Sequence, residues 1–192
     1  MTKDSSRNTS DEVRKRWGEI IAEVKEVLVD NSILPVLSDG TVLGFVREGD
    51  FIKWDFDVDF FVDSKKVMGK EHMLIRRLKA KGFDIITTRN GKTDWKIAIE
   101  KDDLHVDLRS FYRDGFNFIS KVRRSNGKYS VYTMPAIFMD HLQEITFYGE
   151  KYFIPEDTDG YLTHLYGDWS TPIRSVRHDE YLTKAFKKVT RK

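Results

Sequence analysis

The sequence predicts an α/β (α+β) domain in which a mixed β-sheet is flanked by helices and extended by β-hairpins. Three observations predict it. An amphipathic helical pattern covers residues 11–30, a strand, a glycine turn, a helix and a second strand follow over 33–62, and later pairs of strand-like runs are each joined by a Gly-containing turn. With 192 residues and 40% hydrophobic residues, we expect one domain over 1–192 with its own core.

The composition excludes several classes of protein. The chain has no cysteine, which excludes disulfides, thiolate zinc sites and thiol nucleophiles. No apolar run is long enough to span a membrane, and the polar N-terminus has no signal-peptide pattern, so we expect a cytoplasmic protein. The net charge of +2 is too small to indicate a nucleic-acid partner, and none is expected.

The N-terminal part is predicted to be an arm followed by a helix. Residues 1–9 are polar and are expected to form a flexible arm. Thr9 and Glu12 have the spacing of a capping box. Apolar residues then recur at helical spacing, which predicts an amphipathic packing helix over 11–30.

The next segment is predicted to run strand, turn, helix, strand. Residues 33–37 form a short apolar run typical of a buried strand, and 38–41 form a turn. A short helix is expected over 41–48, ending near Gly49, with a strand over 51–62. A glycine turn before a helix presents free backbone N–H groups, which suits phosphate, although many tight turns share this pattern.

Three aspartates alternate near the end of this segment. Asp55, Asp57 and Asp59 would share one face of an extended strand, because side chains alternate across a strand. The opposite face is apolar, so a solvated edge strand is the less favoured interpretation. Converging carboxylates repel unless a cation lies between them, so the spacing predicts a divalent-metal site that handles phosphates.

Residue 107 adds a further carboxylate from another predicted strand. A helix is expected over 64–82, and a hairpin over 83–99 is expected to turn at Asn90-Gly91. In the strand predicted over 104–111, Asp107 shares a face with its neighbours His105 and Arg109. An additional acid from a second strand would complete oxygen coordination of magnesium.

The C-terminal third is predicted to be hairpins and short helices. The expected elements are a basic-tipped hairpin over 116–133, an irregular or short helical stretch over 134–143, a hairpin over 145–154, a loop and helix over 155–166 closed by Gly167, and a basic helix over 176–192. We expect the last helix to be solvated; weak contact with a membrane surface is the alternative.

Several of these stretches together resemble the LicD/fukutin family. The residues that carry the resemblance are the DGTVLG run at 39–44, Arg47, the FIKWDFDVD run at 51–59, HVDL at 105–108, YL at 161–162, YGDW at 166–169 and Pro172. The family commonly has proline where this chain has Lys53. The resemblance covers about residues 33–172.

The resemblance implies a nucleotidyltransferase-like fold and a transferase activity. Enzymes of this family move a phospho-alcohol unit, such as phosphocholine, ribitol phosphate or glycerol phosphate, from a CDP-linked donor to a glycan or glycolipid hydroxyl. They use Mg²⁺ or Mn²⁺. We therefore expect a CDP-linked donor, a glycan acceptor and one of these metal ions as partners of this chain.

On this resemblance we assign metal-binding and catalytic roles to the acids. Asp57 and Asp59 are predicted to be metal ligands, and Asp55 a further ligand or a supporting group. Asp107 is predicted to be a second-metal ligand and general base, since an ionised carboxylate can take the proton of a hydroxyl that a metal has acidified.

A second set is assigned to the donor and its phosphates. It comprises Asp39, Gly40, Thr41, Arg47, Arg109, Tyr166, Asp168 and Trp169. For Arg47, an ion pair with one of the aspartates is an alternative; for Tyr166 and Trp169, core packing is. Two other functions stay open: transfer of a nucleoside monophosphate from an NTP to a small molecule, protein or RNA end, and non-catalytic nucleotide binding.

Overall fold

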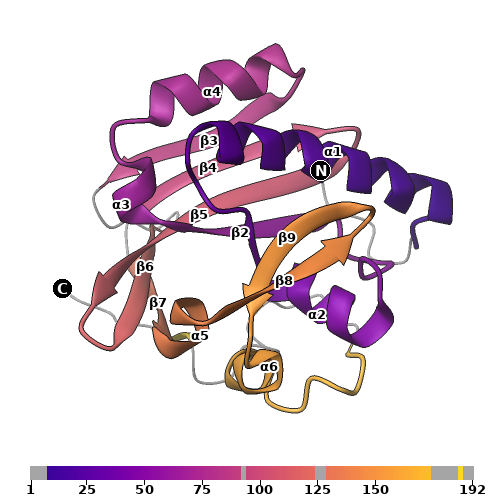
Figure 1. Cartoon of the computed structure of the whole chain (residues 1–192), viewed down its shortest axis with the longest axis vertical. Coiled ribbons are helices and arrows are strands. Elements are labelled where there is room, and N and C mark those ends of the chain that lie inside the picture. The colour runs from indigo at the N-terminus through magenta and orange to yellow at the C-terminus, as the bar shows by residue number, and fades with distance from the viewer. Residues whose placement is uncertain (1–7, 92–93, 124–128, 174–185, 188–192) are drawn as a thin grey trace.

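The computed structural model describes residues 8–91, 94–123, 129–173 and 186–187 (Figure 1). Its helices are α1 (Asp11–Asp30), α2 (Asp39–Glu48), α3 (Ser64–Val67), α4 (Glu71–Ala80), α5 (Ile137–Asp140) and α6 (Thr158–Tyr166). Its strands are β1 (Val36–Ser38), β2 (Asp57–Asp63), β3 (Asp84–Gly91), β4 (Asp94–Lys101), β5 (Leu104–Asp114), β6 (Asn117–Arg123), β7 (Tyr129–Pro135), β8 (Leu142–Phe147), β9 (Glu150–Pro155) and β10 (Phe186–Lys187).

The strands form one mixed, open sheet flanked by helices, so the predicted fold class is confirmed. The main order is β10-β7-β6-β5-β2-β1-β9-β8, with β4 and then β3 added beside β5. β2 and β5 are parallel neighbours, and most other pairs are antiparallel. Because β2 and β5 are central, the side chains on either face of this pair can be enclosed by other elements.

α1 begins at a different cap from the one predicted. Ser10, not Thr9, is the N-cap, and its hydroxyl accepts a hydrogen bond from the Val13 N–H. Thr9 instead donates from both its N–H and its hydroxyl to the carbonyl of Lys53. Thr9 is therefore anchored rather than part of a flexible arm; residues 1–7 lie outside the described part.

α2 follows β1 directly and has the predicted end. Gly49 closes it in the left-handed conformation, at φ 68°. Gly44 is needed inside the helix, because an added Cβ would lie 2.7 Å from the carbonyl oxygen of Asp50. The glycines of this segment thus allow α2 to pack against the chain that leads into β2.

The strand predicted over 51–62 is shorter than expected. β2 begins at Asp57, and the chain before it turns, with the Asp55 N–H donating to the carbonyl of Ile52. Asp55 therefore does not lie on a strand, and the prediction that all three acids alternate along one strand is wrong for Asp55. Asp57 and Asp59 do alternate within β2.

Two other boundaries also differ from the predictions. The single helix expected over 64–82 is divided into α3 and α4, with Gly69 between them at φ 80°. Asn90-Gly91 lies inside β3, where Gly91 pairs with Asp94, so the turn of this hairpin comes later than predicted. The predicted turn at 126–127 lies outside the described residues.

The C-terminal segment is only partly described. Phe186 and Lys187 form β10, which pairs with β7, so the predicted helix over 176–192 is wrong at these two positions. The rest of that segment lies outside the described residues. No helix in the described ranges is long and apolar enough to cross a membrane.

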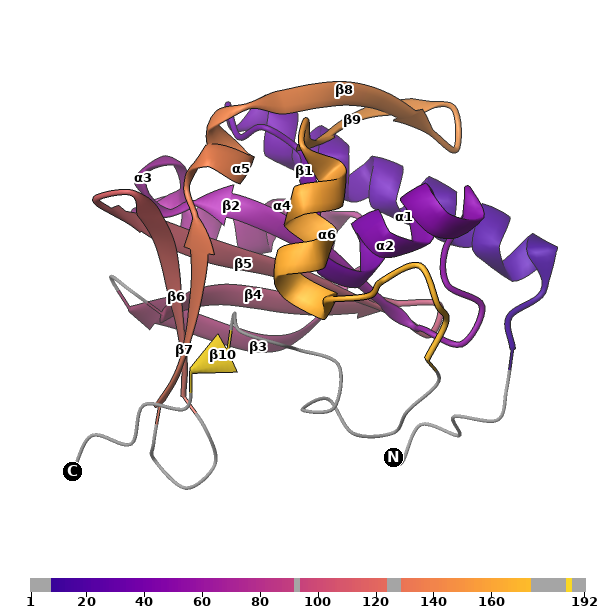
Figure 2. The same ribbon diagram turned by 90° about the horizontal axis from the view of Figure 1, so that it is seen from below.

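The core lies between the sheet and its helices. Val58 and Phe60 point to the face covered by α1, where Trp17 packs edge-on against Phe56 with 5.4 Å between ring centroids. The other face of β2 carries Asp57 and Asp59. α2 and α6 lie side by side near this second face (Figure 2).

Candidate active site

The acids predicted from two strands meet at the centre of the sheet. In the parallel register of β2 and β5, Asp59 is paired with Asp107 and Asp57 with His105. Side chains in paired positions project from the same face. Asp39, at the start of α2, joins them through electrostatic contact with Asp59. We call Asp39, Asp57, Asp59 and Asp107 the acid cluster.

Asp59 is the member under the strongest repulsion. Its backbone N–H donates to the Thr41 hydroxyl at 3.0 Å, which links β2 to α2. Its carboxyl is only 18% exposed. Burial and the neighbouring charges of Asp39, Asp107 and Asp57 raise the pKa of Asp59 well above its usual value, although Arg109 opposes this. A cation near Asp59 would therefore stabilise its ionised carboxylate.

Asp107 has the opposite environment. Lys96 of β4 forms an ion pair with one carboxylate oxygen, and His105 Nε2 lies 3.1 Å from the other. Burial alone would raise the pKa of Asp107, but the hydrogen bond with His105 and the charges of Lys96 and Arg109 outweigh it and lower the pKa to about 2. Asp107 is thus a stable carboxylate that protein cations already neutralise.

The guanidinium group of Arg109, a residue of β5, lies near one acid of each strand. One of its guanidinium nitrogens is 3.9 Å from Asp59 and 3.8 Å from Asp107. Burial would lower the pKa of Arg109, but the charges of Asp59, Asp39 and Asp107 raise it. Its buried Nε has no hydrogen-bond partner within the described part of the chain. Arg109 therefore lies beside the acid cluster, and its contact with donor phosphates stays a prediction.

Asp39 is held in place by tyrosines. It adopts a positive φ of 48°, which is uncommon outside glycine. Its N–H donates to the Tyr161 hydroxyl at 2.9 Å, and its carboxylate accepts from the Tyr132 hydroxyl at 2.9 Å. Burial and the charge of Asp39 raise the pKa of Tyr166 well above its usual range, which places Tyr166 in the same neighbourhood.

Gly40 and Thr41 form the predicted turn beside the acids. A Cβ on Gly40 would lie 2.9 Å from a carboxylate oxygen of Asp55, so glycine allows that carboxylate to approach α2. Ser38, the N-cap residue, makes no side-chain hydrogen bond to the first turn of α2. The backbone N–H groups of Gly40 and Thr41 therefore receive no side-chain cap from Ser38, and their contact with donor phosphate stays a prediction.

Three predicted donor residues lie apart from the acid cluster. Arg47 is eight residues beyond Asp39 on α2, or about 12 Å along the helix. It bonds Glu48 at 2.8 Å and the Trp169 carbonyl at 3.5 Å, so the alternative of an ion pair with an aspartate is not what the structure shows. The Trp169 indole donates to Asp159, and Asp168 accepts from the Ser170 hydroxyl.

The carboxylate oxygens of these residues suit Mg²⁺ or Mn²⁺, but the residues are not arranged as a complete set of metal ligands. Both ions prefer oxygen ligands, and the acid cluster offers carboxylates under mutual repulsion. Within the described ranges, no three acids or histidines lie together as metal ligands do. Asp107, a predicted ligand, forms an ion pair with Lys96 instead.

Sequence reasoning missed three residues of this site. Lys96 alternates with buried residues in β4 and therefore looks like an ordinary solvent-facing lysine. Tyr132 and Tyr161 come from β7 and α6, and only the folded topology brings them to Asp39. The one available signal was Tyr161, which belongs to the C-terminal part of the family resemblance.

A known protein family and a solved structure are similar to this chain. The family model described as "LicD/FKTN/FKRP, nucleotidyltransferase domain" matches residues 33–157, well over half of the chain. No curated protein matches the sequence. A solution structure of the antibiotic-resistance factor ANT(2'')-Ia aligns with 11% identity and a TM-score of 0.42, over 55% of this chain and 52% of that one.

Proposed function

Because this chain belongs to the LicD/FKTN/FKRP family of phospho-alcohol transferases, we propose that it moves a phospho-alcohol unit from a CDP-linked donor to a glycan or glycolipid hydroxyl with Mg²⁺ or Mn²⁺. The transferred unit would be phosphocholine, ribitol phosphate or glycerol phosphate.

One observation carries the proposal: the parallel pairing of Asp59 with Asp107, beside the start of α2. It supports a site in which carboxylates from two strands face a substrate whose phosphates lie near the first turn of α2. A phosphoryl-transfer enzyme needs positioning and charge neutralisation more than covalent chemistry of its own. The acid cluster, Arg109 and the backbone of Gly40 and Thr41 are the groups suited to those tasks.

In the proposed reaction, the acceptor oxygen forms a new bond to the phosphorus that bears the alcohol. The bond from that phosphorus to the bridging oxygen breaks, and CMP leaves with the bridging oxygen and its electron pair. The acceptor proton passes to Asp107, which is ionised at neutral pH. A bound divalent ion would neutralise diphosphate charge and acidify the acceptor hydroxyl.

The remaining residues have supporting roles in this proposal. Asp57 and Asp59 would hold the metal, with Asp39 and Asp55 close enough to assist. Arg109 would neutralise the charge of the diphosphate, and the backbone of Gly40 and Thr41 would donate to it. Tyr166 would line the nucleotide pocket near Asp39, whereas Arg47, Asp168 and Trp169 would contribute from the far end of α2.

A donor screen tests the proposal. The Tm of the protein is measured with CDP-choline, CDP-ribitol or CDP-glycerol and with ATP, CTP or UTP, each with and without Mg²⁺. We expect a CDP-linked donor to raise Tm only with Mg²⁺, because ligand at about 100 times its Kd stabilises a protein by about 2.7 kcal/mol.

Other outcomes would indicate a different function for the protein. A response to an NTP alone would indicate nucleotidyl transfer, and the expected reaction would then release pyrophosphate. A response to nucleotide that is equal in EDTA would indicate a non-catalytic binding module. Absence of any response would contradict the proposal.

A further inference from the structure

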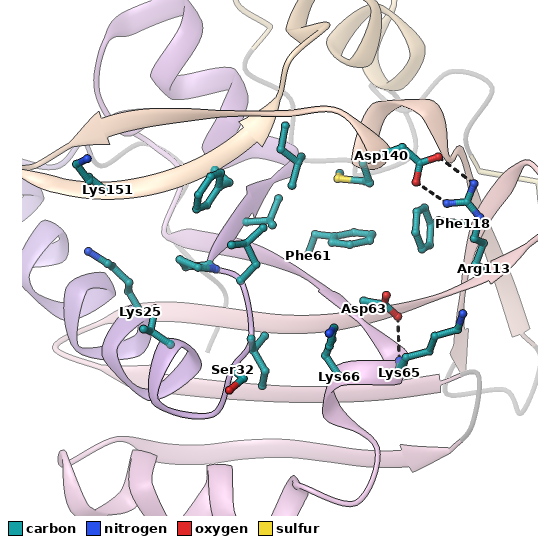
Figure 3. Close-up of a pocket in the computed structure, with 18 residues that line it drawn as sticks. Lys25, Ser32, Phe61, Asp63, Lys65, Lys66, Arg113, Phe118, Asp140 and Lys151 are labelled. Carbon is teal, nitrogen blue, oxygen red and sulfur yellow. Dashed lines mark hydrogen bonds and ion pairs between the residues drawn. The ribbon is translucent and has the colours of Figure 1, made fainter.

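A cavity opens at the C-terminal end of β2, away from the acid cluster (Figure 3). Its volume is about 710 Å³, within the range of small-molecule sites. No member of the acid cluster lines it. Its floor includes Phe61, two residues beyond Asp59 on the same strand, and its walls come from α1, α3, β6 and the β8–β9 hairpin. We call this cavity the basic pocket.

The floor of the basic pocket is apolar and firmly packed. Phe61 stacks on Phe111 at 4.9 Å between ring centroids and meets Phe118 edge-on at 5.2 Å. The apolar lining continues outward to Val29 and Leu34, which are 51% and 46% exposed. An apolar ligand would cover these two side chains without requiring the aromatic floor to rearrange.

The rim of the pocket is cationic. Five cations and two carboxylates line it: Lys25, Lys65, Lys66, Arg113 and Lys151, with Asp63 and Asp140. Three of the cations are already paired: Lys25 with Glu150, Lys151 with Glu144 and Arg113 with Asp140.

Lys65 and Lys66 differ from these three. Neither has a carboxylate partner within the described ranges, and both are exposed on α3. Asp63 accepts a hydrogen bond from the backbone N–H of Lys65 at 2.9 Å, as the cap of that helix. Figure 3 shows both lysines on the α3 side of the pocket. Two ammonium groups that have no carboxylate partner among the described residues therefore lie beside an apolar cavity.

We propose that the basic pocket binds a single-chain amphiphilic anion, namely a phosphate monoester with an alkyl tail. The tail would lie over Phe61 and Phe118, and the phosphate would meet Lys65 and Lys66. An apolar cavity alone would suit a neutral ligand, and a lysine pair alone would suit inorganic phosphate. The combination favours a ligand that has both parts, and it does not rest on the proposed transfer reaction.

Calorimetric titration of octyl phosphate, kept below its micelle-forming concentration, tests this directly. We expect one ligand per chain. Each methylene that becomes buried can tighten binding up to about fourfold, so octyl phosphate should bind at least about tenfold tighter than butyl phosphate. Octanol and inorganic phosphate, each lacking one part, should both bind at least about tenfold more weakly than octyl phosphate.

Matched variants locate the binding. Val29→Asp places a carboxylate in the lining and should weaken octyl phosphate at least about tenfold. Val13→Asp alters an exposed valine of the same helix outside the pocket and should leave affinity unchanged. Lys65→Ala/Lys66→Ala should weaken the phosphate ester but not octanol.

Two further variants complete the design. Arg76→Ala/Lys79→Ala removes two exposed charges of α4 and should have no effect. Asp59→Asn should bind octyl phosphate as the unmodified protein does, which separates this site from the acid cluster.

Three results would overturn the inference. Inorganic phosphate that binds as tightly as octyl phosphate would remove the role of the apolar floor. Unchanged affinity in Val29→Asp, in a variant whose Tm is preserved, would place the ligand elsewhere. Binding to phosphatidylglycerol vesicles without binding to monomeric octyl phosphate would make this surface a membrane contact.

Discussion

At the scale of single residues, the acid cluster balances carboxylates against cations. Asp107 has Lys96 and His105 as partners, whereas Asp59 has Arg109 at 3.9 Å and three acidic neighbours. The pKa values of the two paired acids therefore shift in opposite directions. Such divergence between neighbouring carboxylates is typical of functional sites.

Asp59→Asn is expected to stabilise the metal-free protein at neutral pH. The folded pKa of Asp59 is raised, so the folded state binds its proton more tightly than the unfolded state does. Ionisation of Asp59 therefore lowers stability as pH rises above about 4, the unfolded pKa. The Tm advantage of the variant should grow from pH 4 upward, at about 2–4 °C per kcal/mol.

Asp103→Asn is the control for this change. Asp103 is an exposed acid with φ 63°, a conformation that asparagine tolerates, and it lies outside the acid cluster. The Tm of this variant at neutral pH should equal that of the unmodified protein, because the exposed side chain of Asp103 lies outside the acid cluster. An Asp59→Asn protein that is less stable than the unmodified protein at every pH would contradict the repulsion described above.

Lys96→Met is expected to destabilise the metal-free protein by about 3 kcal/mol, because it removes the ammonium group paired with Asp107, whose side chain is 11% exposed, and leaves only the contacts with His105 and Arg109. The loss should appear as a fall in Tm of about 6–12 °C. If Asp107 is a metal ligand, Mn²⁺ should raise the Tm of this variant more than that of the unmodified protein. Equal responses to Mn²⁺ would indicate that Asp107 is not a metal ligand.

At the scale of elements, sequence patterns found most helices and strands but misplaced their ends. α1 was predictable from periodicity, yet its cap is Ser10 because Thr9 is bonded to Lys53. The helix over 64–82 divides at Gly69, whose positive φ local periodicity does not reveal. Asp55 does not lie on β2, because the chain turns between Ile52 and Asp55 before the strand begins.

The contact between α1 and the β8–β9 hairpin gives an element-scale prediction. Gly18 of α1 lies against Tyr148 of the hairpin turn, and an added Cβ would be 2.4 Å from the ring. Gly18→Ala should destabilise the protein by about 1–3 kcal/mol through overpacking, even though alanine favours a helix by about 1 kcal/mol. Urea denaturation measures the difference.

A double-mutant cycle separates the two effects. In a Tyr148→Ser background the ring is absent, so Gly18→Ala should be neutral or stabilising by up to about 1 kcal/mol. The same destabilisation in both backgrounds would show that the ring of Tyr148 does not account for glycine at position 18.

At the scale of the whole molecule, the sheet topology brings together residues that are far apart in the sequence. The alternation of Asp57 and Asp59 and the presence of Asp107 were readable from the chain, and the parallel pairing of β2 with β5 brings them together. Lys96, Tyr132 and the basic pocket depend on contacts between distant segments. Their residue types at those positions have no local signature.

The acid cluster and the basic pocket also lie at different positions along β2. Asp57 and Asp59 face the acid cluster, and Phe61 and Asp63 belong to the basic pocket. The proposed transfer and the proposed amphiphile binding can therefore be tested independently in the same protein. A variant at one end of β2 acts as the control for the other end.

Mn²⁺ binding, followed by electron paramagnetic resonance, tests the central claim about the acid cluster most directly. We expect saturable binding to the unmodified protein, at least about tenfold weaker binding to Asp59→Asn, and unchanged binding to Asp103→Asn. The same Mn²⁺ affinity in the unmodified protein and in Asp59→Asn, or no saturable binding to either, would contradict the assignment of this cluster as a metal-dependent active site.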